Sequence, residues 1–233
     1  MKKLGIIGAM DIEVAILKEK LVDSKVTTIG KMAFFEGKLS GLDVVVVQCG
    51  VGKVNAAMCA QTLCVRFAVN HLVNTGIAGS LDADLDIGDV LVSRDAMYHD
   101  FDCVNFGYPM GKIPGMDVIS FPADEEMIRL AFEASESLKP GHTKLGRVAT
   151  GDQFVAEKAL KNQIIERTQA NCTEMEGAAI AQTAYLNGIP FVILRAISDK
   201  ADDSAQMDYP TFERLAAEHC AAVTEALAGE MAK

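Results

Sequence analysis

Apolar runs and amphipathic segments alternate along this chain of 233 residues. The run at 191–197 is almost wholly apolar and rich in Phe, Val and Ile, which is typical of a strand covered on both faces. Similar patterns predict further strands at 4–7, 44–47, 71–75, from 90 onward and at 143–150, and helices from 11, after 52, at 124–138, at 156–167 and from about 210. We therefore predict an α/β fold, a single domain over residues 1–233 with a central mixed β-sheet flanked by helices.

The stretch at 171–200 carries acids at both ends of a predicted helix and strand. Glu174 and Glu176 open the helix, and the sequence Gly-Ile-Pro ends it. Ser198 and Asp199 follow the strand, and the carboxyl ends of strands are where ligands bind in open α/β sheets. These acids indicate a site, although each also has a structural interpretation. Thr173 to Glu176 fits a capping box, and Asp199 can begin a turn.

Three predicted strands end in turns that contain glycine, with the sequences Gly-Ala-Met, Gly-Val-Gly and Thr-Gly-Ile-Ala-Gly-Ser. Glycine lets a ligand approach the backbone closely. None of the turns has the G-x-G-x-x-G spacing of dinucleotide folds, and the phosphate-binding lysine motif is absent from the sequence. The turns alone therefore do not predict a nucleotide cofactor.

Net charge, the length of the apolar runs and the spacing of the cysteines each exclude a class of function. The formal net charge is −10, which argues against a broad surface for nucleic acid or an anionic membrane. The first residues meet acids too early for a secretory signal, and no apolar run approaches membrane-spanning length. The six cysteines form no C-x-x-C pair, and no histidine stands at a metal-ligand spacing from them. We expect a reduced, cytoplasmic protein with no disulfide, metal or organic cofactor.

The segment at 100–121 is rich in Gly, Pro and aromatic residues and has no clear period. Loops of this length in a compact domain usually carry function or form an interface.

Seven motifs occur in order over nearly the whole chain: G-I-I-G-A-M-x-x-E, G-V-G-K-V-N-A-A, N-T-G-I-A-G, Y-H-D, T-G-D-Q-F, E-M-E-G-A-A and R-A-I-S-D. In this the chain resembles the bacterial 5′-methylthioadenosine/S-adenosylhomocysteine nucleosidases of the purine nucleoside phosphorylase superfamily. The resemblance implies a nucleoside phosphorylase-like fold and hydrolysis of the N-glycosidic bond of 5′-methylthioadenosine, S-adenosylhomocysteine and 5′-deoxyadenosine. It also implies a homodimer that needs no cofactor.

The reaction requires an acid, a base and groups that grip the sugar, because the bond breaks through an oxocarbenium-like state with negative charge on the departing base. By resemblance, Asp199 is the general acid that protonates adenine N7, and Glu13 holds and activates the water. Arg195 and the backbone near Ala78 help to fix Glu13 and the water. Glu13 also has a structural interpretation, as an acid in the first turn of a helix.

The remaining contacts to the nucleoside follow from the same resemblance. Glu176 accepts hydrogen bonds from the ribose hydroxyls, Met175 packs under the sugar, and Glu174 is a second acid near it. On the base, Phe154 stacks on adenine and the Val155 backbone reads its edge, although the pattern alone predicts Phe154 in the core. Two further residues at the substrate are Gly79 and Ser198.

The apolar 5′ group needs a pocket of soft side chains. By resemblance, Met10, Val51 and Tyr209 form it within one chain. The long loop of the partner subunit completes it with three residues, Cys103, Phe106 and Pro114.

Two positions depart from the family pattern. Ile77 stands where family members often carry a hydroxyl that helps to hold the water, so we expect Glu13 and Arg195 to hold it here. Tyr209 stands where Phe is common, which bears on how the long thioether of S-adenosylhomocysteine is received.

Three alternatives remain open from the sequence. A phosphorolytic relative would use phosphate in place of water, but Asp11 and Glu13 at the N-terminal turn would repel it. Another purine nucleoside, such as futalosine or aminodeoxyfutalosine, would need only a different 5′ pocket. A non-catalytic protein that binds an adenosyl ligand would have no need of Glu13.

Overall fold

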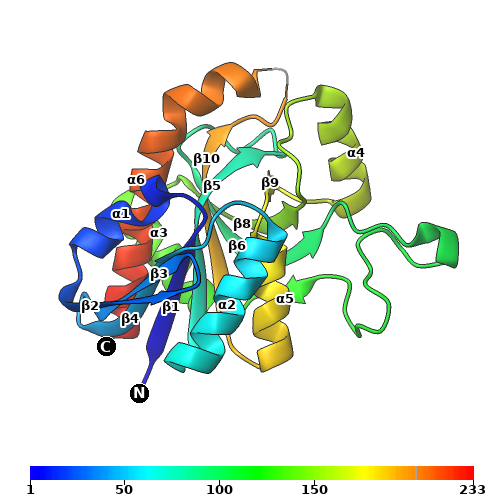
Figure 1. The fold of residues 1–233 in the computed structure, drawn as a ribbon. Coiled ribbons are helices and arrows are strands. Elements are labelled where there is room, and N and C mark those ends of the chain that lie inside the picture. Colours follow the sequence, from blue (N-terminus) through cyan, green and yellow to red (C-terminus); the bar gives the residue numbers. More distant parts are fainter. Residues whose placement is uncertain (203) are drawn as a thin grey trace.

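One twisted mixed β-sheet runs through the molecule, with helices on both of its faces (Figure 1). The structure is a computed structural model that describes residues 1–202 and 204–233, with only the backbone described at 206 and 207. Within these residues the strands are Lys3–Gly8 (β1), Val22–Ile29 (β2), Met32–Leu39 (β3), Leu42–Gln48 (β4), His71–Ser80 (β5), Val90–Tyr98 (β6), Phe121–Pro122 (β7), Thr143–Thr150 (β8), Cys172–Glu174 (β9) and Phe191–Asp199 (β10). The helices are Asp11–Glu19 (α1), Lys53–Phe67 (α2), Glu125–Leu138 (α3), Lys158–Thr168 (α4), Gly177–Asn187 (α5) and Ala205–Met231 (α6), with a 3₁₀ turn at Val104–Phe106 (η1).

Part of the sheet closes on itself. The strand order is β10-β6-β8-β9-β5-β1-β4-β3-β2, and β10 also pairs with β5. The strands β5, β10, β6, β8 and β9 therefore form a ring in which every strand has a partner on each side. The pairing is parallel for β10 with β5, β6 with β8 and β8 with β9, and antiparallel for β10 with β6 and β5 with β9. The predicted mixed sheet in a single α/β domain is confirmed.

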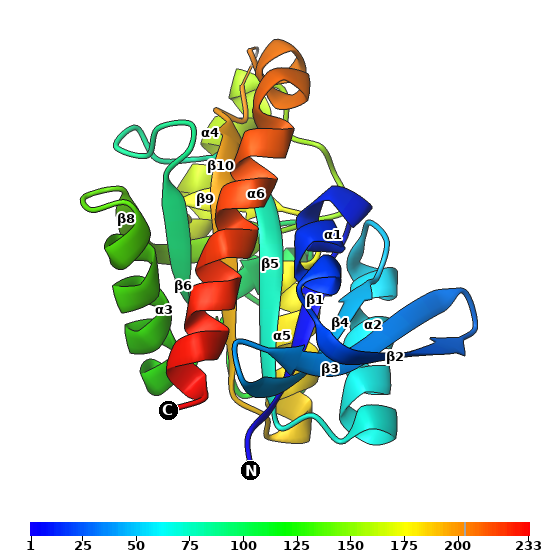
Figure 2. The same ribbon diagram turned by 90° about the vertical axis from the view of Figure 1, so that its left-hand side faces the viewer.

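Alternate residues of each buried strand serve the two faces of the sheet. In β4, Val45 and Val47 belong to the core cluster that includes α2 and α5 residues, whereas Val44 and Val46 belong to the cluster of α1, α3 and α6. Figure 2 shows the sheet face that carries this second cluster: α6 lies along it, with α3 on one side of α6 and α1 on the other. The apolar runs lack a period of two because both faces are covered.

The strand at 143–150 has the predicted bounds, but β5 does not end at Thr75. The predicted turn Thr-Gly-Ile-Ala-Gly-Ser is the second half of the strand, paired with β10 and then with β9. At two positions of this half-strand only glycine fits, because neighbouring side chains lie too close for any other residue. The backbone does not turn there. A side chain at Gly76 would collide with Glu13 and Arg195, and one at Gly79 with Asp199.

Other boundaries also differ from the prediction. Glu174 does not open a helix: it ends the short strand β9, and α5 begins at Gly177. The capping box predicted from Thr173 is wrong, because Glu176 is the residue that precedes the helix. Met10, not Asp11, precedes α1. The last helix begins at Ala205 and contains Pro210 in its interior. The hairpin of β2 and β3 was not predicted.

The segment at 100–121 projects from the body of the molecule, where Figure 1 shows it in green. Apart from η1 and the first residue of β7 it has no helix or strand. The Phe106 side chain on it is 82% exposed. No helix in the described part of the chain is both long and apolar enough to cross a membrane.

Candidate active site

A pocket opens where several strands and turns end around β5 and β10. It brings together all fourteen residues that the sequence predicted within one chain: Met10, Glu13, Val51, Ala78, Gly79, Phe154, Val155, Glu174, Met175, Glu176, Arg195, Ser198, Asp199 and Tyr209. The lining also includes Ala9, Ile77, Gln153 and Thr173. Of these four, Ile77 was noted only as a departure from the family pattern. The Thr-x-x-Glu pattern led us to assign Thr173 to a cap. Ala9 and Gln153 lie within two of the seven motifs, but the sequence analysis gave them no role.

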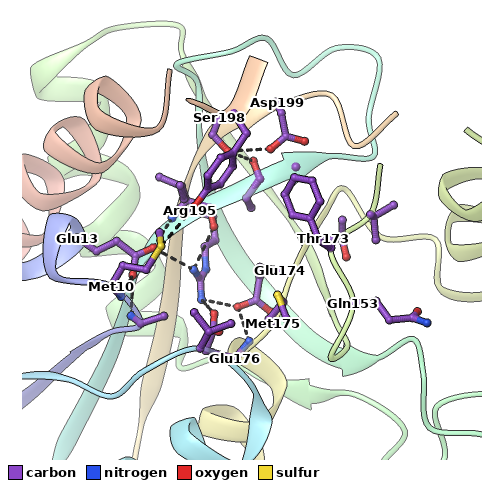
Figure 3. Close-up of a pocket in the computed structure, with 18 residues that line it drawn as sticks. Met10, Glu13, Gln153, Thr173, Glu174, Met175, Glu176, Arg195, Ser198 and Asp199 are labelled. Carbon is purple, nitrogen blue, oxygen red and sulfur yellow. Dashed lines mark hydrogen bonds and ion pairs between the residues drawn. The ribbon is translucent and has the colours of Figure 1, made fainter. Parts of the chain in front are cut away.

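Arg195 in the middle of β10 is the centre of the polar wall (Figure 3). Its side chain is 1% exposed, and its Nη2 donates to Glu174 and to Asn74. Nη1 donates to the Ile77 carbonyl at 3.1 Å and lies 3.9 Å from Glu13 Oε1. Burial alone would lower the pKa of Arg195, but the surrounding carboxylates outweigh burial and raise it. The guanidinium therefore stays charged and holds the acids around it.

Glu13 lies in the first turn of α1, and its side chain turns back to the residues before the helix. Oε2 accepts hydrogen bonds from the backbone N–H groups of Ala9 at 2.6 Å and Met10 at 2.9 Å. Oε1 accepts one from the Ile77 N–H at 3.1 Å. The carboxylate thus caps the helix and also faces the pocket, so the structural and functional interpretations both apply. Burial raises the pKa of Glu13, against the effect of Arg195 and the three N–H groups.

Asp199 ends β10 and is buried. Its Oδ1 accepts a hydrogen bond from the Ala201 N–H at 2.8 Å, so Asp199 begins a turn, as the sequence allowed. Its Oδ2 accepts a hydrogen bond from the Ser198 hydroxyl at 2.9 Å. Burial raises the pKa of Asp199, although these two hydrogen bonds oppose the shift. The site therefore favours the protonated carboxyl more than water does.

Glu176 precedes α5 and joins it to the turn at 50–52. Its Oε1 accepts from the Gly52 N–H at 2.8 Å, and its Oε2 lies 3.6 Å from Arg195 Nη2. Burial, together with the neighbouring charge of Glu174, raises the pKa of Glu176 to about 7. This carboxyl can therefore change its charge near neutral pH.

Glu174 lines the same wall but is occupied by protein donors. Besides Arg195, its Oε2 accepts from the N–H groups of Glu176 at 3.1 Å and Gly177 at 2.7 Å. Its Oε1 accepts from the Thr150 hydroxyl. These bonds hold the start of α5 and the guanidinium in place.

Comparison with known proteins finds relatives over nearly the whole chain. Residues 3–228 match the family model described as the phosphorylase superfamily. The 5′-methylthioadenosine/S-adenosylhomocysteine nucleosidase of Staphylococcus haemolyticus is 39% identical over 228 residues, which are 96% of this chain and 98% of the relative. The crystal structure of the Neisseria meningitidis nucleosidase with methylthio-immucillin-A superposes with a TM-score of 0.96 at 33% identity, covering 99% of this chain and 100% of that chain.

This chain belongs to the 5′-methylthioadenosine/S-adenosylhomocysteine nucleosidase family. The neighbours also include the futalosine hydrolase of Helicobacter pylori, with a TM-score of 0.93 at 33% identity and 98% of each chain covered. Membership of the family identifies the chain as an N-glycosyl hydrolase.

The apolar end of this nucleosidase pocket is formed by side chains from three segments. The Tyr209 hydroxyl donates to Met10 Sδ at 3.4 Å. The Phe154 ring meets the Tyr209 ring edge to face, with centroids 5.5 Å apart. Phe154 is 51% exposed, so the core position that its pattern predicted is wrong, and Val51 is also exposed. These side chains leave an apolar surface beside the polar wall.

The family's loop residues lie elsewhere. Cys103, Phe106 and Pro114 do not line the pocket of their own chain. They belong to the projecting segment at 100–121, so their role at a site depends on a second subunit.

Proposed function

We propose that this chain hydrolyses the N-glycosidic bond of 5′-methylthioadenosine and S-adenosylhomocysteine, releasing adenine and the 5-thio-ribose. One observation carries the proposal: a carboxyl whose protonated form is favoured by burial, Asp199, shares a pocket with a carboxylate held by three backbone N–H groups, Glu13. Loss of a purine base needs such an acid together with a base.

Asp199 is the general acid at adenine N7. An aspartic acid donates a proton near neutral pH only when its surroundings raise its pKa, and burial does so here. The Ser198 hydroxyl orients the carboxyl through Oδ2. Protonation at N7 removes negative charge from the base as the bond breaks.

Glu13 is the base that orients and deprotonates the water. Its raised pKa makes it a better proton acceptor than an exposed glutamate. Arg195 and the backbone N–H groups fix its orientation. Because Ile77 has no hydroxyl, Glu13 and Arg195 hold the water without one. The Ala78 backbone lines the pocket beside this carboxylate.

Glu176 binds the ribose hydroxyls. In its ionised form it accepts two hydrogen bonds and stabilises the positive charge that develops on the sugar. Met175 lines the pocket beside it and packs under the ring. Glu174 acts on the ribose only through its neighbours, because its oxygens are already bound by protein donors.

The base stacks on Phe154, is read by the Val155 backbone, and lies near Gly79. The 5′ group lies against Met10, Val51 and Tyr209, which offer the soft surface that a thioether prefers. The same pocket accommodates 5′-deoxyadenosine, whose 5′ group is a smaller apolar one. Nothing in this set of residues calls for a cofactor.

A homodimer completes the site. Exposed apolar side chains stand on α2, at Val54, Met58 and Val65, and on α5, at Leu186, and Figure 1 shows the two helices side by side. An apolar surface of this kind supports a protein interface. In the dimer, the segment at 100–121 brings Cys103, Phe106 and Pro114 to the partner's 5′ pocket. We place the enzyme in the cytoplasm.

A second purine nucleoside substrate is favoured by one observation, the close match to a futalosine hydrolase. Hydrolysis of futalosine has the same catalytic requirements, so only the 5′ pocket would distinguish it from 5′-methylthioadenosine. A phosphorolytic reaction is disfavoured because the Glu13 carboxylate lines the pocket and would repel phosphate there. Asp11, expected to add to this repulsion, does not line the pocket and pairs with Lys18 instead.

The test is adenine release from 5′-methylthioadenosine in phosphate-free buffer, repeated with added phosphate. Equal release in both buffers, with methylthioribose as co-product, supports hydrolysis. Release only with phosphate, with a sugar 1-phosphate formed, overturns the role of Glu13. The variant Glu13→Gln, which keeps the shape of the side chain, should lose turnover by about 10²–10⁴-fold. It should still bind adenine, as a control for folding. Parallel assays with futalosine measure the second candidate substrate.

A further inference from the structure

Thr173 has a buried hydroxyl that no protein group uses. The residue is 5% exposed in the middle of β9 and lines the pocket, where Figure 3 labels it with the other lining side chains. Its Oγ1 has no hydrogen-bond partner among the residues that the structure describes. It does not cap α5, because that helix begins four residues later at Gly177. Buried hydroxyls are nearly always hydrogen-bonded, so this one is free for a ligand.

The sheet places this hydroxyl in one row with the proposed acid. Asp199 in β10 pairs with Gly79 in β5, and Gly79 pairs with Thr173 in β9. Paired residues point to the same face of a sheet, and two strand spacings separate the Cα atoms of Asp199 and Thr173 by about 10 Å. Gly79 between them has no side chain, and any side chain there would collide with Asp199. Ala201 lies equally close to Gly79. The row therefore has a carboxyl at one end, a hydroxyl at the other and no side chain of its own between them.

Polar groups at the two ends of this row match the polar edges of a purine ring. The ring has nitrogen acceptors on two opposite edges, with N7 on one edge and N3 on the other. We propose that the Thr173 hydroxyl donates a hydrogen bond to N3 of the bound adenine. This inference rests on the proposed function, which assigns Asp199 to N7.

The bond has a consequence for the reaction. Negative charge that develops on the departing base spreads over its ring nitrogens, including N3, and a donor aimed at that charge stabilises it. Thr173 and Asp199 then bind the leaving group from opposite edges. A purine with carbon in place of N3 loses this contact and leaves the hydroxyl unpaired.

The test compares adenine with 3-deazaadenine, in which a C–H group replaces N3. Dissociation constants are measured by calorimetry for the wild type, for Thr173→Val, which keeps the branched shape without the hydroxyl, and for Thr173→Ser, which keeps the hydroxyl. We expect Thr173→Val to weaken adenine binding by about two- to tenfold and to leave 3-deazaadenine binding unchanged. Thr173→Ser should retain the preference of the wild type for adenine.

Two results overturn the inference. Equal weakening of both ligands by Thr173→Val would make the residue a packing group, and equal affinity of the wild type for both ligands would place N3 elsewhere. Turnover of 5′-methylthioadenosine by the wild type is measured in the same experiment and tests the proposed function independently. An active wild type whose variants do not discriminate rejects Thr173 alone. A wild type that neither releases nor binds adenine rejects both.

Discussion

Glu174 accepts hydrogen bonds from Arg195 and, through the same Oε2 atom, from the N–H groups of Glu176, just before α5, and Gly177, its first residue. One carboxylate therefore fixes both the guanidinium that lies beside Glu13 and the backbone that carries Glu176. This geometry makes Glu174 a positioning residue, and its negative charge is one of the causes that raise the pKa of Glu176.

Glu174→Gln should move the pH dependence of the reaction. The low-pH limb of kcat/KM reports ionisation of Glu176 in the free enzyme, near pH 7 by its pKa. Removing the charge of Glu174 lowers the pKa of Glu176, so the limb shifts to lower pH. The variant should also lose about 1–3 kcal/mol of unfolding free energy. Glu174→Asp, which keeps the charge, is the control. An unshifted limb in Glu174→Gln would show that Glu176 does not set it.

Glu176 should make the folded state less stable as the pH rises. Its pKa is 4.5 in the unfolded chain and about 7 in the fold, so the native state binds the extra proton between these values. Stability from this group is fully present below pH 4.5 and is lost as pH rises to 7, an effect on the order of 3 kcal/mol. Glu176→Gln should remove this contribution, which denaturant unfolding at pH 4.5, 6 and 7.5 measures. Parallel stability curves for the two proteins would contradict the assigned shift.

Phe154→Ala should weaken binding of every adenine nucleoside. Stacking of a base on an aromatic ring contributes about 1–3 kcal/mol, so the Michaelis constant should rise by roughly 5- to 150-fold. Because Phe154 is half exposed, the melting temperature should change little. Phe154→Tyr keeps the stacking surface and should behave like the wild type. A similar increase in Phe154→Tyr would assign the effect to packing against Tyr209.

Mixing two inactive subunits should restore activity if the sites are shared. Glu13→Gln removes the base from its own pocket. Phe106→Asp places a charge on the loop that, in the proposed dimer, reaches the partner's 5′ pocket. In a mixed dimer, one pocket combines an intact Glu13 with an intact loop, so turnover should return to about one quarter of wild type for random exchange of equal amounts. Each variant alone is the control. Mixed samples that exchange subunits without gaining activity would show that each site is complete within one chain.

The sequence predicted the site better than it predicted the backbone beneath it. The family resemblance named fourteen residues of one chain, and all of them line one pocket. The helix assigned at Glu174 was wrong, since a three-residue strand has too few positions to show a period. The glycines of β5 suggested a turn because only the folded chain reveals Glu13, Arg195 and Asp199 against them. Thr173 was assigned to a cap for the same reason: its pairing with Gly79 links residues far apart in the chain.

The closed ring of strands limits how the catalytic part of the pocket can change during evolution. A strand paired on both sides cannot slip along one neighbour without breaking its bonds to the other. The distance from Asp199 on β10 to the Ile77 amide on β5, which holds Glu13, is therefore set by strand register. We expect relatives with different 5′ substrates to have evolved through the segment at 100–121 and the first turns of α6, which lie outside the ring. In amide exchange, the ring should be the slowest part of the molecule to exchange, and that segment among the fastest.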